Sequence, residues 1–302
     1  MAIDIVLATY NGAKYLEAQI ESILAQDHQD WRLIIRDDAS TDATPTLIAN
    51  YEQKFPERIQ VLKGEKKRLG IVGNFSALLA ATTNQYVMCA DQDDVWLPNK
   101  LSITLTGMKE LEKKHGEQTP LLVHTDSSIV DAALQPVADS FNAHHKLSAH
   151  LSPFARLLVH NTVQGCTTMV NRALLTLALP IPPVARMYDM WLAQVAAGTG
   201  QVGYIEQSTL RYRQHGSNVV GTRKKTLREK VGHIQNMMEG NVTQAIMLRD
   251  RIADKLNEPN RAALEQFTKL PDYGFLRRRF VLMRNNILRQ PGWENVPMLV
   301  FV

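Results

Sequence analysis

Apolar and polar residues change their spacing repeatedly along the first part of the chain. Residues 3–10 (IDIVLATY) are almost wholly apolar, which is typical of a short strand buried on both faces. In residues 15–26 the apolar positions recur at helical spacing. The alternation continues, with strands expected at 31–40, 58–63 and 86–94 and helices expected up to about Phe55, over 73–83 and over 98–114. This pattern predicts an α/β fold with a mostly parallel sheet and helices on both faces.

The pattern loosens after residue 121. We expect strands at 121–131, 167–170 and 203–215, a loop at 132–150, and helices at 171–178 and 189–197. Beyond Thr222 the sequence is helical and polar, with breaks at Glu258-Pro259 and at 269–274. We therefore expect an α/β domain over residues 1–221, divided into halves at 1–115 and 116–221, and a helical C-terminal extension over residues 222–302.

Charge supports the same division. The net charge of +4 combines 15 Lys/Arg and 8 Asp/Glu after residue 221 with 19 Lys/Arg and 22 Asp/Glu before it. A basic extension suits anionic lipid, a phosphate-bearing substrate or no specific partner. One segment of the extension predicts either a basic amphipathic helix on a membrane surface or a solvated helix packed on the domain. It consists of Arg277-Arg278-Arg279, the string FVLM, Arg284 and Arg289. The sequence has no basic patch with interleaved aromatic residues, so it does not indicate binding of nucleic acid.

Cysteine usage and the N-terminus bear on the compartment. Cys89 and Cys166 lie far apart, which excludes a disulfide framework and a clustered-cysteine metal site, and we expect both side chains to be buried. The opening residues resemble a strand and not a signal peptide, and no uncharged apolar run reaches the about 18 residues of a membrane span. We expect a cytoplasmic protein, with peripheral contact to the inner face of the cell membrane as a second hypothesis.

The candidate chemistry lies at the ends of three predicted strands. Thr9-Tyr10-Asn11-Gly12 follows the first strand, Asp37-Asp38 ends the second, and Asp91-Gln92-Asp93-Asp94 ends the fourth. In parallel α/β sheets these ends meet at one edge, where ligands bind. Carboxylates gathered there would repel each other unless a divalent cation lay between them. The sequence therefore predicts a metal beside a phosphate-bearing ligand.

Three sequence motifs of known ligand-binding sites are absent, which reduces the number of candidate ligand classes. The chain has no G-x-G-x-x-G after the first strand, no G-x-x-x-x-G-K-[ST] and no H-E-x-x-H. The turn after the first strand is poor in glycine, and an acid pair follows the second strand. This combination favours recognition of a base and ribose over a pyrophosphate cradle.

Six strings in order carry a resemblance to a known family. They are ATYNGAKYLEAQIESILAQ, IIRDDASTDAT, ADQDDVWLPNKL, GCTTMVNRAL, YDMWLA and YRQHGSNVVG. Together they resemble glycosyltransferase family 2 with the GT-A fold, in the order found in bacterial rhamnosyltransferase-like members, over about residues 1–221. The resemblance implies a nucleotide-binding half at 1–115 and an acceptor and catalytic half at 116–221.

The resemblance also implies roles for particular residues. Asp189 would be the catalytic base, Asp93 would ligate Mn²⁺ or Mg²⁺, and His215 would close over the diphosphate and join the metal shell. The expected nucleotide-binding residues are Thr9, Tyr10, Asn11, Asp37, Asp38, Asp91 and Gln92, with Asp38 at the base, Asp37 as a second candidate there, and Asp91 at the ribose. Further candidate contacts to donor or acceptor are Asn74, Asp94, Trp96, Gly165, Cys166, Trp191 and Arg213.

The implied reaction is a direct displacement. Asp189 would take the proton of an acceptor hydroxyl as that oxygen attacks the anomeric carbon, which inverts the configuration there. We expect the Asp189 carboxylate to be partly solvated and not held in an apolar pocket. Two departures from the family pattern stand out: Tyr188 replaces an acidic residue before Asp189, and Ala39 stands where glycine is commoner.

Several alternatives remain open from the sequence. The favoured donor is dTDP-rhamnose, with UDP-glucose, UDP-galactose or a UDP-hexosamine as the alternative, and the acceptor would be a glycan or lipid-linked glycan of a bacterial surface polysaccharide. A binding protein that has lost turnover is a different class, and a nucleotidyltransferase is a third, although only Lys14 is available for its basic loop. Asp37-Asp38 and Asp189 could instead be helix caps, His215 could be structural, and Trp96 and Trp191 could be packing residues or a platform for a sugar.

Overall fold

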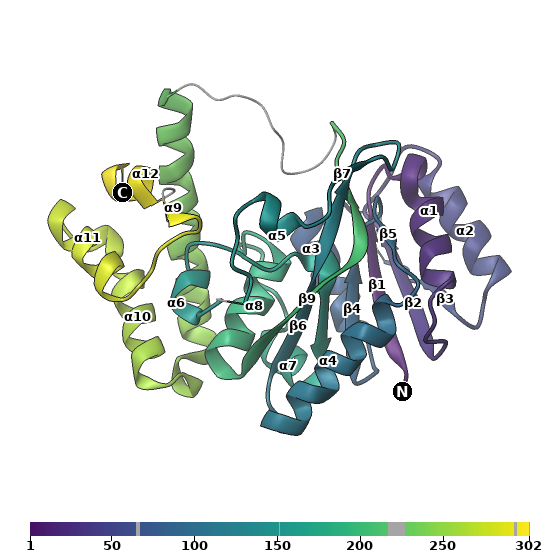
Figure 1. Ribbon diagram of the computed structural model, residues 1–302, viewed down its shortest axis with the longest axis horizontal. Helices are drawn as coiled ribbons and strands as arrows, with labels where there is room; N and C mark the ends of the chain where they lie inside the picture. The colour runs from purple at the N-terminus through teal and green to yellow at the C-terminus, as the bar shows by residue number, and fades with distance from the viewer. Residues whose placement is uncertain (65–66, 151, 217–226, 293–294, 302) are drawn as a thin grey trace.

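The computed structural model describes residues 1–64, 67–150, 152–216, 227–292 and 295–301. One sheet crosses the molecule, with the strand order β3-β2-β1-β4-β8-β6-β9-β5, and β7 pairs with β6 (Figure 1). The strands are β1 (Ile3–Thr9), β2 (Trp31–Asp37), β3 (Ile59–Val61), β4 (Tyr86–Ala90), β5 (Val95–Trp96), β6 (Leu121–Val130), β7 (Pro136–Ala138), β8 (Thr168–Asn171) and β9 (Gln201–Arg213).

The sheet is mixed. Strands β1 to β4 are parallel to one another, as predicted, and β6 is parallel to β9. Strand β8 lies between β4 and β6 and runs antiparallel to both, and β5 and β7 pair antiparallel with β9 and β6. All four residues of β8 are buried, so its apolar pattern carries no information about direction, and the mostly parallel expectation missed this strand.

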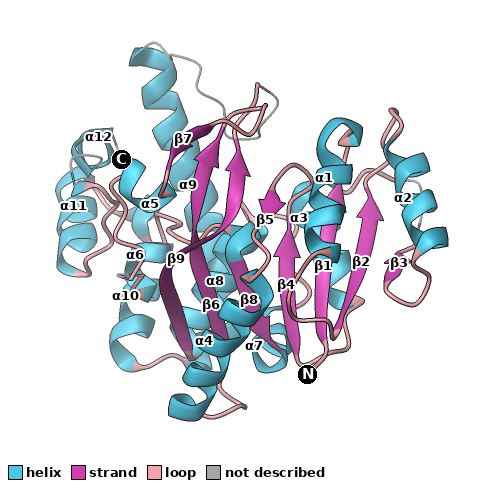
Figure 2. Ribbon diagram, turned by 45° about the vertical axis from the view of Figure 1, so that its right-hand side comes forward, coloured by secondary structure: helices cyan, strands magenta, loops and turns pink. Residues whose placement is uncertain are grey.

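Helices cover both faces of the sheet, as predicted (Figure 2). Along β1, Ile3, Ile5 and Leu7 belong to one buried cluster and Val6 to the other, because successive side chains of a strand point to opposite faces. Helices α1 (Ala13–Leu24), α2 (Thr44–Lys54) and α4 (Lys100–His115) contribute to the first cluster. Helices α3 (Gly70–Ala80), α6 (Phe154–Leu157), α7 (Arg172–Ala178) and α8 (Tyr188–Thr199) contribute to the second.

The segment expected as a loop at 132–150 contains regular structure. Strand β7 lies within it, and Ser140 caps the short helix α5 (Phe141–His144) by accepting a hydrogen bond from the backbone N–H of Ala143. Both elements are only three or four residues long, which is too short for a periodic pattern to reveal them.

The C-terminal extension is helical, as predicted. It consists of α9 (Leu227–Ile252), α10 (Glu258–Thr268), α11 (Phe275–Arg284) and α12 (Asn295–Phe301), and it lies at one end of the molecule (Figure 1). Leu248, Phe267 and Leu282 share a buried cluster with Leu157 and Trp191 of the α/β domain. The expected boundary at residues 221 and 222 lies outside the described residues. No helix in the described part of the chain is long and apolar enough to cross a membrane.

Candidate active site

The ends of β1 and β2 are joined by side chains that the sequence singled out. The Thr9 hydroxyl donates to Oδ1 of Asp37 at 2.9 Å, and the backbone N–H of Asp38 donates to the carbonyl of Thr9 at 2.8 Å. Asn11 adopts a positive φ of 47°, and its side-chain oxygen accepts from the backbone N–H of Thr41 at 2.8 Å. These contacts bring the two predicted nucleotide-binding turns together.

Gln92 fixes the turn after β1 from the side of β4. Its Oε1 accepts from the backbone N–H of Tyr10 at 2.8 Å, and its Nε2 donates to the carbonyl of Tyr10 at 3.0 Å. A Cβ at Gly12 would lie 2.2 Å from Oε1 of Gln92, so only glycine allows this approach. Both functional groups of the Gln92 amide are therefore occupied by backbone, which gives Gln92 a positioning role.

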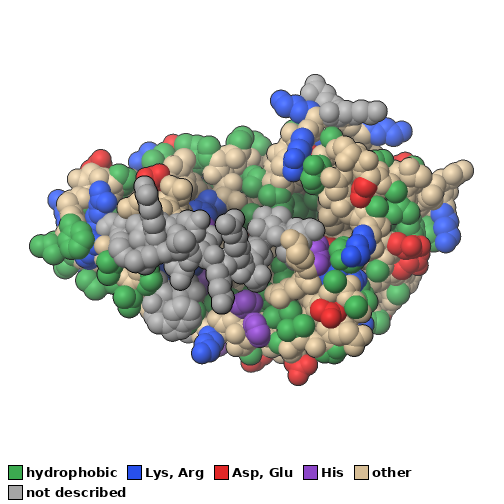
Figure 3. Space-filling model, turned by 90° about the horizontal axis from the view of Figure 1, so that it is seen from above, with side chains coloured by type: hydrophobic (Ala, Val, Ile, Leu, Met, Phe, Trp, Pro, Cys, Tyr) green, Lys and Arg blue, Asp and Glu red, His purple; other side chains and the backbone are tan. Residues whose placement is uncertain are grey.

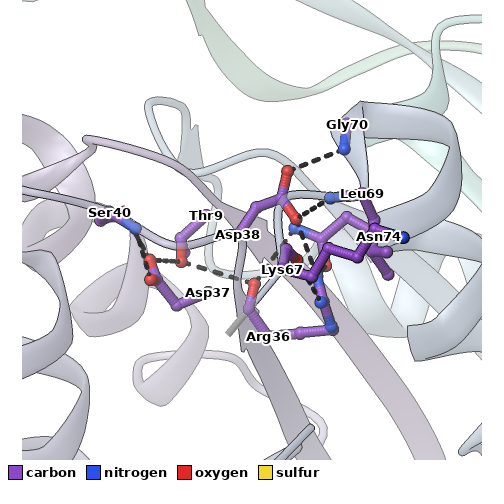
Figure 4. A network of polar contacts seen from close by, with 9 residues as sticks. All are labelled: Thr9, Arg36, Asp37, Asp38, Ser40, Lys67, Leu69, Gly70 and Asn74. Atoms are coloured by element: carbon purple, nitrogen blue, oxygen red, sulfur yellow. Dashed lines mark hydrogen bonds and ion pairs between the residues drawn. The ribbon is translucent and has the colours of Figure 1, made fainter. Parts of the chain in front are cut away.

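Asp38 is the centre of a buried polar network (Figure 4). Its Oδ1 accepts from Arg36 at 3.0 Å and from the backbone N–H of Leu69 at 2.7 Å, and its Oδ2 accepts from the backbone N–H of Gly70 at 2.9 Å. The Arg36 guanidinium also donates to Asn74 at 3.0 Å. Asp38 thus holds the start of α3 against the end of β2, while Asp37 is the more exposed of the pair.

The Tyr10 ring, a candidate for stacking on a base, already has a neighbour. The Arg68 guanidinium lies 3.9 Å from the ring centroid, which is within cation–π distance. Tyr10 is half-buried and Arg68 is exposed. Nothing in the sequence marked Arg68, because it stands within the basic run after β3 that also contains Lys63 and Lys67.

Four carboxylates meet beyond the end of β4. Desolvation, together with the charges of Asp94, Asp93 and Asp189, raises the pKa of Asp91 well above its usual range. Desolvation and the charge of Asp93 also raise the pKa of Asp94, which is fully buried. The predicted convergence of acidic residues therefore includes Asp189, which lies about a hundred positions further along the chain.

His215 reaches the same place from the end of β9. Its Nε2 lies 2.8 Å from Oδ2 of Asp93. The His215 ring packs on Tyr15, with ring centroids 4.7 Å apart, and the guanidinium of Arg213 lies 4.6 Å from the Tyr15 ring centroid. Arg213 also donates to the backbone carbonyls of Asp93 and Ala132, at 2.7 and 2.8 Å. The pairing of His215 with Asp93 brings together the two residues expected to ligate a metal.

Asp189 stands in the first turn of α8. Its Oδ2 accepts from the backbone N–H of Gly165 at 3.0 Å, and its Oδ1 accepts from the backbone N–H of Met190 at 2.7 Å. The residue is only 8% exposed, and burial raises the pKa of its carboxyl to about 6. The expectation of a partly solvated base was wrong, because α8 packs into the core and the hydrogen bonds to backbone N–H groups compensate for the lost water.

The candidate donor and acceptor contacts divide into two groups. Arg213 and Asp94 lie in the carboxylate cluster. The others are buried supports: Trp191 is fully buried and donates from its indole N–H to Ala178, Trp96 is 2% exposed, and Asn74, Gly165 and Cys166 are buried as well. A sugar platform on Trp96 or Trp191 does not fit, since neither ring offers an accessible face, and packing explains both.

Sequence reasoning missed Tyr15 and Lys100 as well as Arg68. Lys100 is fully buried at the start of α4, donates to the Thr209 hydroxyl at 3.2 Å, and has its pKa lowered to about 8 by burial. Its position directly after Pro98-Asn99 indicated an ordinary exposed helix start. Tyr15 stood on a predicted helix face with nothing to connect it to residue 215.

The residues present suit a hard divalent cation. Asp93 and His215 offer a carboxylate oxygen and an imidazole nitrogen, and the half-buried Asp91 has carboxylates on several sides whose mutual repulsion a cation would relieve. The Cys166 sulfur and oxygens of Asp91 and Asp94 lie within 4.8 Å of one another. Burial raises the pKa of the Cys166 thiol well above its usual range.

Known proteins resemble this chain at the level of sequence. Residues 4–115 match the model of glycosyl transferase family 2. An uncharacterized glycosyltransferase of Nostoc sp. is 28% identical over 225 residues, which cover 72% of this chain and 66% of that protein. The dTDP-rhamnosyl transferase RfbG of Shigella flexneri is 34% identical over 98 residues, or 32% of this chain and 34% of that protein. The Escherichia coli UDP-Glc:alpha-D-GlcNAc-diphosphoundecaprenol beta-1,3-glucosyltransferase WfgD is 25% identical over 194 residues, or 63% and 68%.

Solved structures share the fold. S. aureus TarS 1-349 in complex with UDP-GlcNAc superposes with a TM-score of 0.59 at 14% identity, covering 94% of this chain and 80% of that one. The mannosyltransferase PcManGT of Pyrobaculum calidifontis, in complex with GDP-Man and Mn²⁺, gives a TM-score of 0.58 at 16% identity, with 94% and 72% covered. Residues 4–115 therefore resemble glycosyl transferase family 2, and the likeness to these solved structures shows a GT-A-like fold.

Proposed function

We propose that this enzyme transfers a sugar from a nucleoside-diphosphate donor to an acceptor hydroxyl, with inversion at the anomeric carbon and with a divalent cation bound by Asp93 and His215. The observation that carries the proposal is the 2.8 Å contact between these two side chains inside a cluster that also contains Asp91 and Asp189. A metal ligand pair and a carboxylate base at one site are the groups such a displacement requires.

Asp189 performs the proton transfer in this proposal. The backbone N–H groups of Gly165 and Met190 hold one oxygen each, so the carboxylate has a fixed orientation before substrate arrives. The acceptor hydroxyl loses its proton to Asp189 while its oxygen forms the new bond to the anomeric carbon and the bond to the diphosphate breaks. A pKa of about 6 makes Asp189 a stronger base than an exposed aspartate while leaving it largely ionised at neutral pH.

The leaving diphosphate needs positive charge near it. When bound, Mn²⁺ or Mg²⁺ supplies Lewis-acid stabilisation of the developing negative charge. The Arg213 guanidinium, anchored through the carbonyls of Asp93 and Ala132, adds a fixed cation beside the same residues. Asp91 would meet the ribose, and Thr9, Tyr10, Asn11 and Asp37 would surround the base. Asp38, which was expected at the base, has its carboxylate oxygens bonded to Arg36 and to the backbone N–H groups of Leu69 and Gly70, so Asp37 takes that role in the proposal.

For the donor we propose dTDP-rhamnose, with a UDP-hexose or UDP-hexosamine as the second candidate. The activity in the name of the dTDP-rhamnosyl transferase RfbG, at 34% identity over 98 residues, supports the first. The UDP-Glc of WfgD and the UDP-GlcNAc of TarS support the second. The diphosphoundecaprenol acceptor in the name of WfgD supports a glycan or lipid-linked glycan of a surface polysaccharide as the acceptor.

A donor panel tests the proposal. We expect one nucleoside diphosphate sugar to raise the melting temperature in the presence of Mn²⁺ and to have much less effect in EDTA, because a ligand stabilises the folded state according to its affinity. The same donor should then support transfer with inversion, detected by NMR of the product. If a donor stabilised both the wild type and Asp189→Asn while neither of them turned it over, that result would favour the binding-protein alternative. The absence of a metal-dependent shift with all donors would contradict the proposed site.

A further inference from the structure

The C-terminal extension leaves an apolar surface uncovered. Of the large hydrophobic side chains of α11, Leu276 is 79% exposed, Phe275 63%, Phe280 57% and Met283 55%, and α12 adds Val296 at 63% and Val300 at 52%. We call these six residues the α11 face. Figure 3 shows hydrophobic side chains next to basic ones at the end of the molecule where α11 lies in Figure 1.

The exposure follows from how α11 packs. Val281 and Leu282 point inward and belong to the buried cluster shared with the α/β domain. Leu276, Phe280 and Met283 recur at spacings of four and three, so they form a stripe on the outward side of the same helix. The helix is therefore already anchored by one side, and its second apolar stripe stays largely exposed in the part of the chain that the structure describes. Contiguous exposed apolar surface of this kind marks an interaction site.

Arginine side chains surround the stripe. The guanidinium of Arg279 lies 3.1 Å from the ring centroid of Phe275, and that of Arg284 lies 5.7 Å from the centroid of Phe280. Arg279 also donates to the carbonyl of Val300 at 3.0 Å, which joins the α11 and α12 parts of the face. Residues 269–289 contain six Lys/Arg and a single acidic residue, Asp272. The surface combines aromatic and aliphatic side chains with concentrated positive charge.

This combination distinguishes between two occupants. A second copy of the chain packed through the same face would bring one set of arginines against another, and like charges at an interface oppose association. An anionic bilayer offers hydrocarbon to the apolar stripe and negative headgroups to the arginines. The aromatic rings suit the boundary between headgroups and acyl chains.

We propose that the α11 face docks this enzyme on an anionic phospholipid bilayer, with α11 lying in the plane of the interface. The proposal is independent of the donor and of the metal, because no residue of the face belongs to the carboxylate cluster. It gives a physical basis for acting on an acceptor held at a membrane surface.

Vesicle flotation of the full chain tests the proposal. We expect binding to phosphatidylcholine vesicles that contain phosphatidylglycerol, little binding to pure phosphatidylcholine, and loss of binding at high salt. The double variant Leu276→Asp/Phe280→Asp should reduce the partition coefficient at least tenfold, and Val137→Asp, an exposed apolar residue on β7, should not. Arg277→Gln/Arg284→Gln should reduce binding about tenfold or more, since each basic residue at the surface adds about 1 kcal/mol. The matched control Lys113→Gln/Lys114→Gln removes two exposed charges from α4 and should have little effect.

Three outcomes would overturn the proposal. The first is no binding to anionic vesicles at low salt, and the second is equal binding by the wild type and Leu276→Asp/Phe280→Asp. The third is self-association of the wild type in sedimentation velocity that this double variant abolishes and the control variants do not. That result would assign the α11 face to a second copy of the chain. Circular dichroism and donor-induced stabilisation should be unchanged in the double variant. If the wild type bound anionic vesicles but no nucleoside diphosphate sugar, the proposed function would be contradicted and the membrane proposal would stand.

Discussion

His215 and Asp93 lie in contact, with Nε2 and Oδ2 2.8 Å apart, although 122 residues separate them in the chain. The contact joins the segment after β9 to the end of β4. The Tyr15 ring packs against the imidazole at a centroid distance of 4.7 Å, so a residue of α1 also restricts the orientation of His215. Three elements thus determine where this imidazole lies before any ligand binds.

The variant His215→Ala should weaken binding of the divalent cation. Losing one metal ligand, or a group that orients one, costs about 10- to 100-fold in metal affinity or activity. Titration of activity with Mn²⁺ would measure the change, and a high Mn²⁺ concentration should restore part of the activity. His150→Ala, which alters an exposed histidine, serves as the control. An unchanged Mn²⁺ requirement in His215→Ala would show that the contact is structural only.

The variant Asp189→Asn should lose turnover and keep donor affinity. Removal of a general base lowers kcat by about 10²- to 10⁴-fold, while the donor contacts we propose lie elsewhere. Steady-state kinetics and donor-induced stabilisation separate the two effects. Asp139→Asn, at an exposed position, is the matched control. If Asp189→Asn kept near-normal turnover, Asp189 would be a structural residue that holds the Gly165 segment and not the base; it is not the cap of α8, since the N-cap position is Met187.

The pH profile follows from the raised pKa of Asp189. Because the base acts in its ionised form and its pKa is about 6, kcat/KM should be level above that pH. Below it, protonation of the carboxyl should lower kcat/KM about tenfold per pH unit. Measurement at saturating Mn²⁺, with a stability check at each pH, separates this effect from unfolding. An acidic limb centred near 4 would mean that Asp189 is solvated in solution.

The order of elements and the convergence of acidic residues at the candidate site were predictable for identifiable reasons. Strands such as β1 are short apolar runs, and the acids that follow β2 and β4 stand where parallel strands end at one edge. The direction of β8, the burial of Asp189 and the contact of Tyr15 with His215 depend on how distant segments pack. No local pattern encodes such packing. Trp191 stands two positions after Asp189, yet its ring is buried in the core because it lies on the inner side of α8.

Gly12 should tolerate no side chain. In Gly12→Ala the new Cβ would lie 2.2 Å from Oε1 of Gln92, so Gln92 must move and give up its two hydrogen bonds to the Tyr10 backbone. We expect a loss of about 1–3 kcal/mol in the free energy of unfolding together with weaker nucleotide binding. In a Gln92→Ala background the clash disappears, so the added effect of Gly12→Ala should be small. Gly64→Ala, with open space around it, is the control.

Arg36 should contribute strongly to stability, because its partner is buried with it. The Arg36 and Asp38 side chains are 7% and 4% exposed, and removing one member of a buried ion pair costs about 3–5 kcal/mol. Urea unfolding of Arg36→Met measures the cost, and faster hydrogen exchange at the Leu69 and Gly70 amides would report loosening of the segment that Asp38 holds. Arg249→Met breaks an exposed pair with Asp250 and should change stability by less than about 1 kcal/mol.

Ala39 offers a stabilising change. Its φ of 63° lies in the left-handed region, which costs an alanine about 1–2 kcal/mol, whereas glycine adopts it freely. Ala39→Gly also loses about 0.5–1 kcal/mol through the greater freedom of the unfolded chain, which leaves a net gain of about 0.5–1 kcal/mol in the free energy of unfolding. Ala18→Gly, at an exposed position inside α1, should lose about 1 kcal/mol under the same urea assay, because glycine disfavours a helix interior. If both variants were destabilised equally, the positive φ of Ala39 would carry no strain in solution.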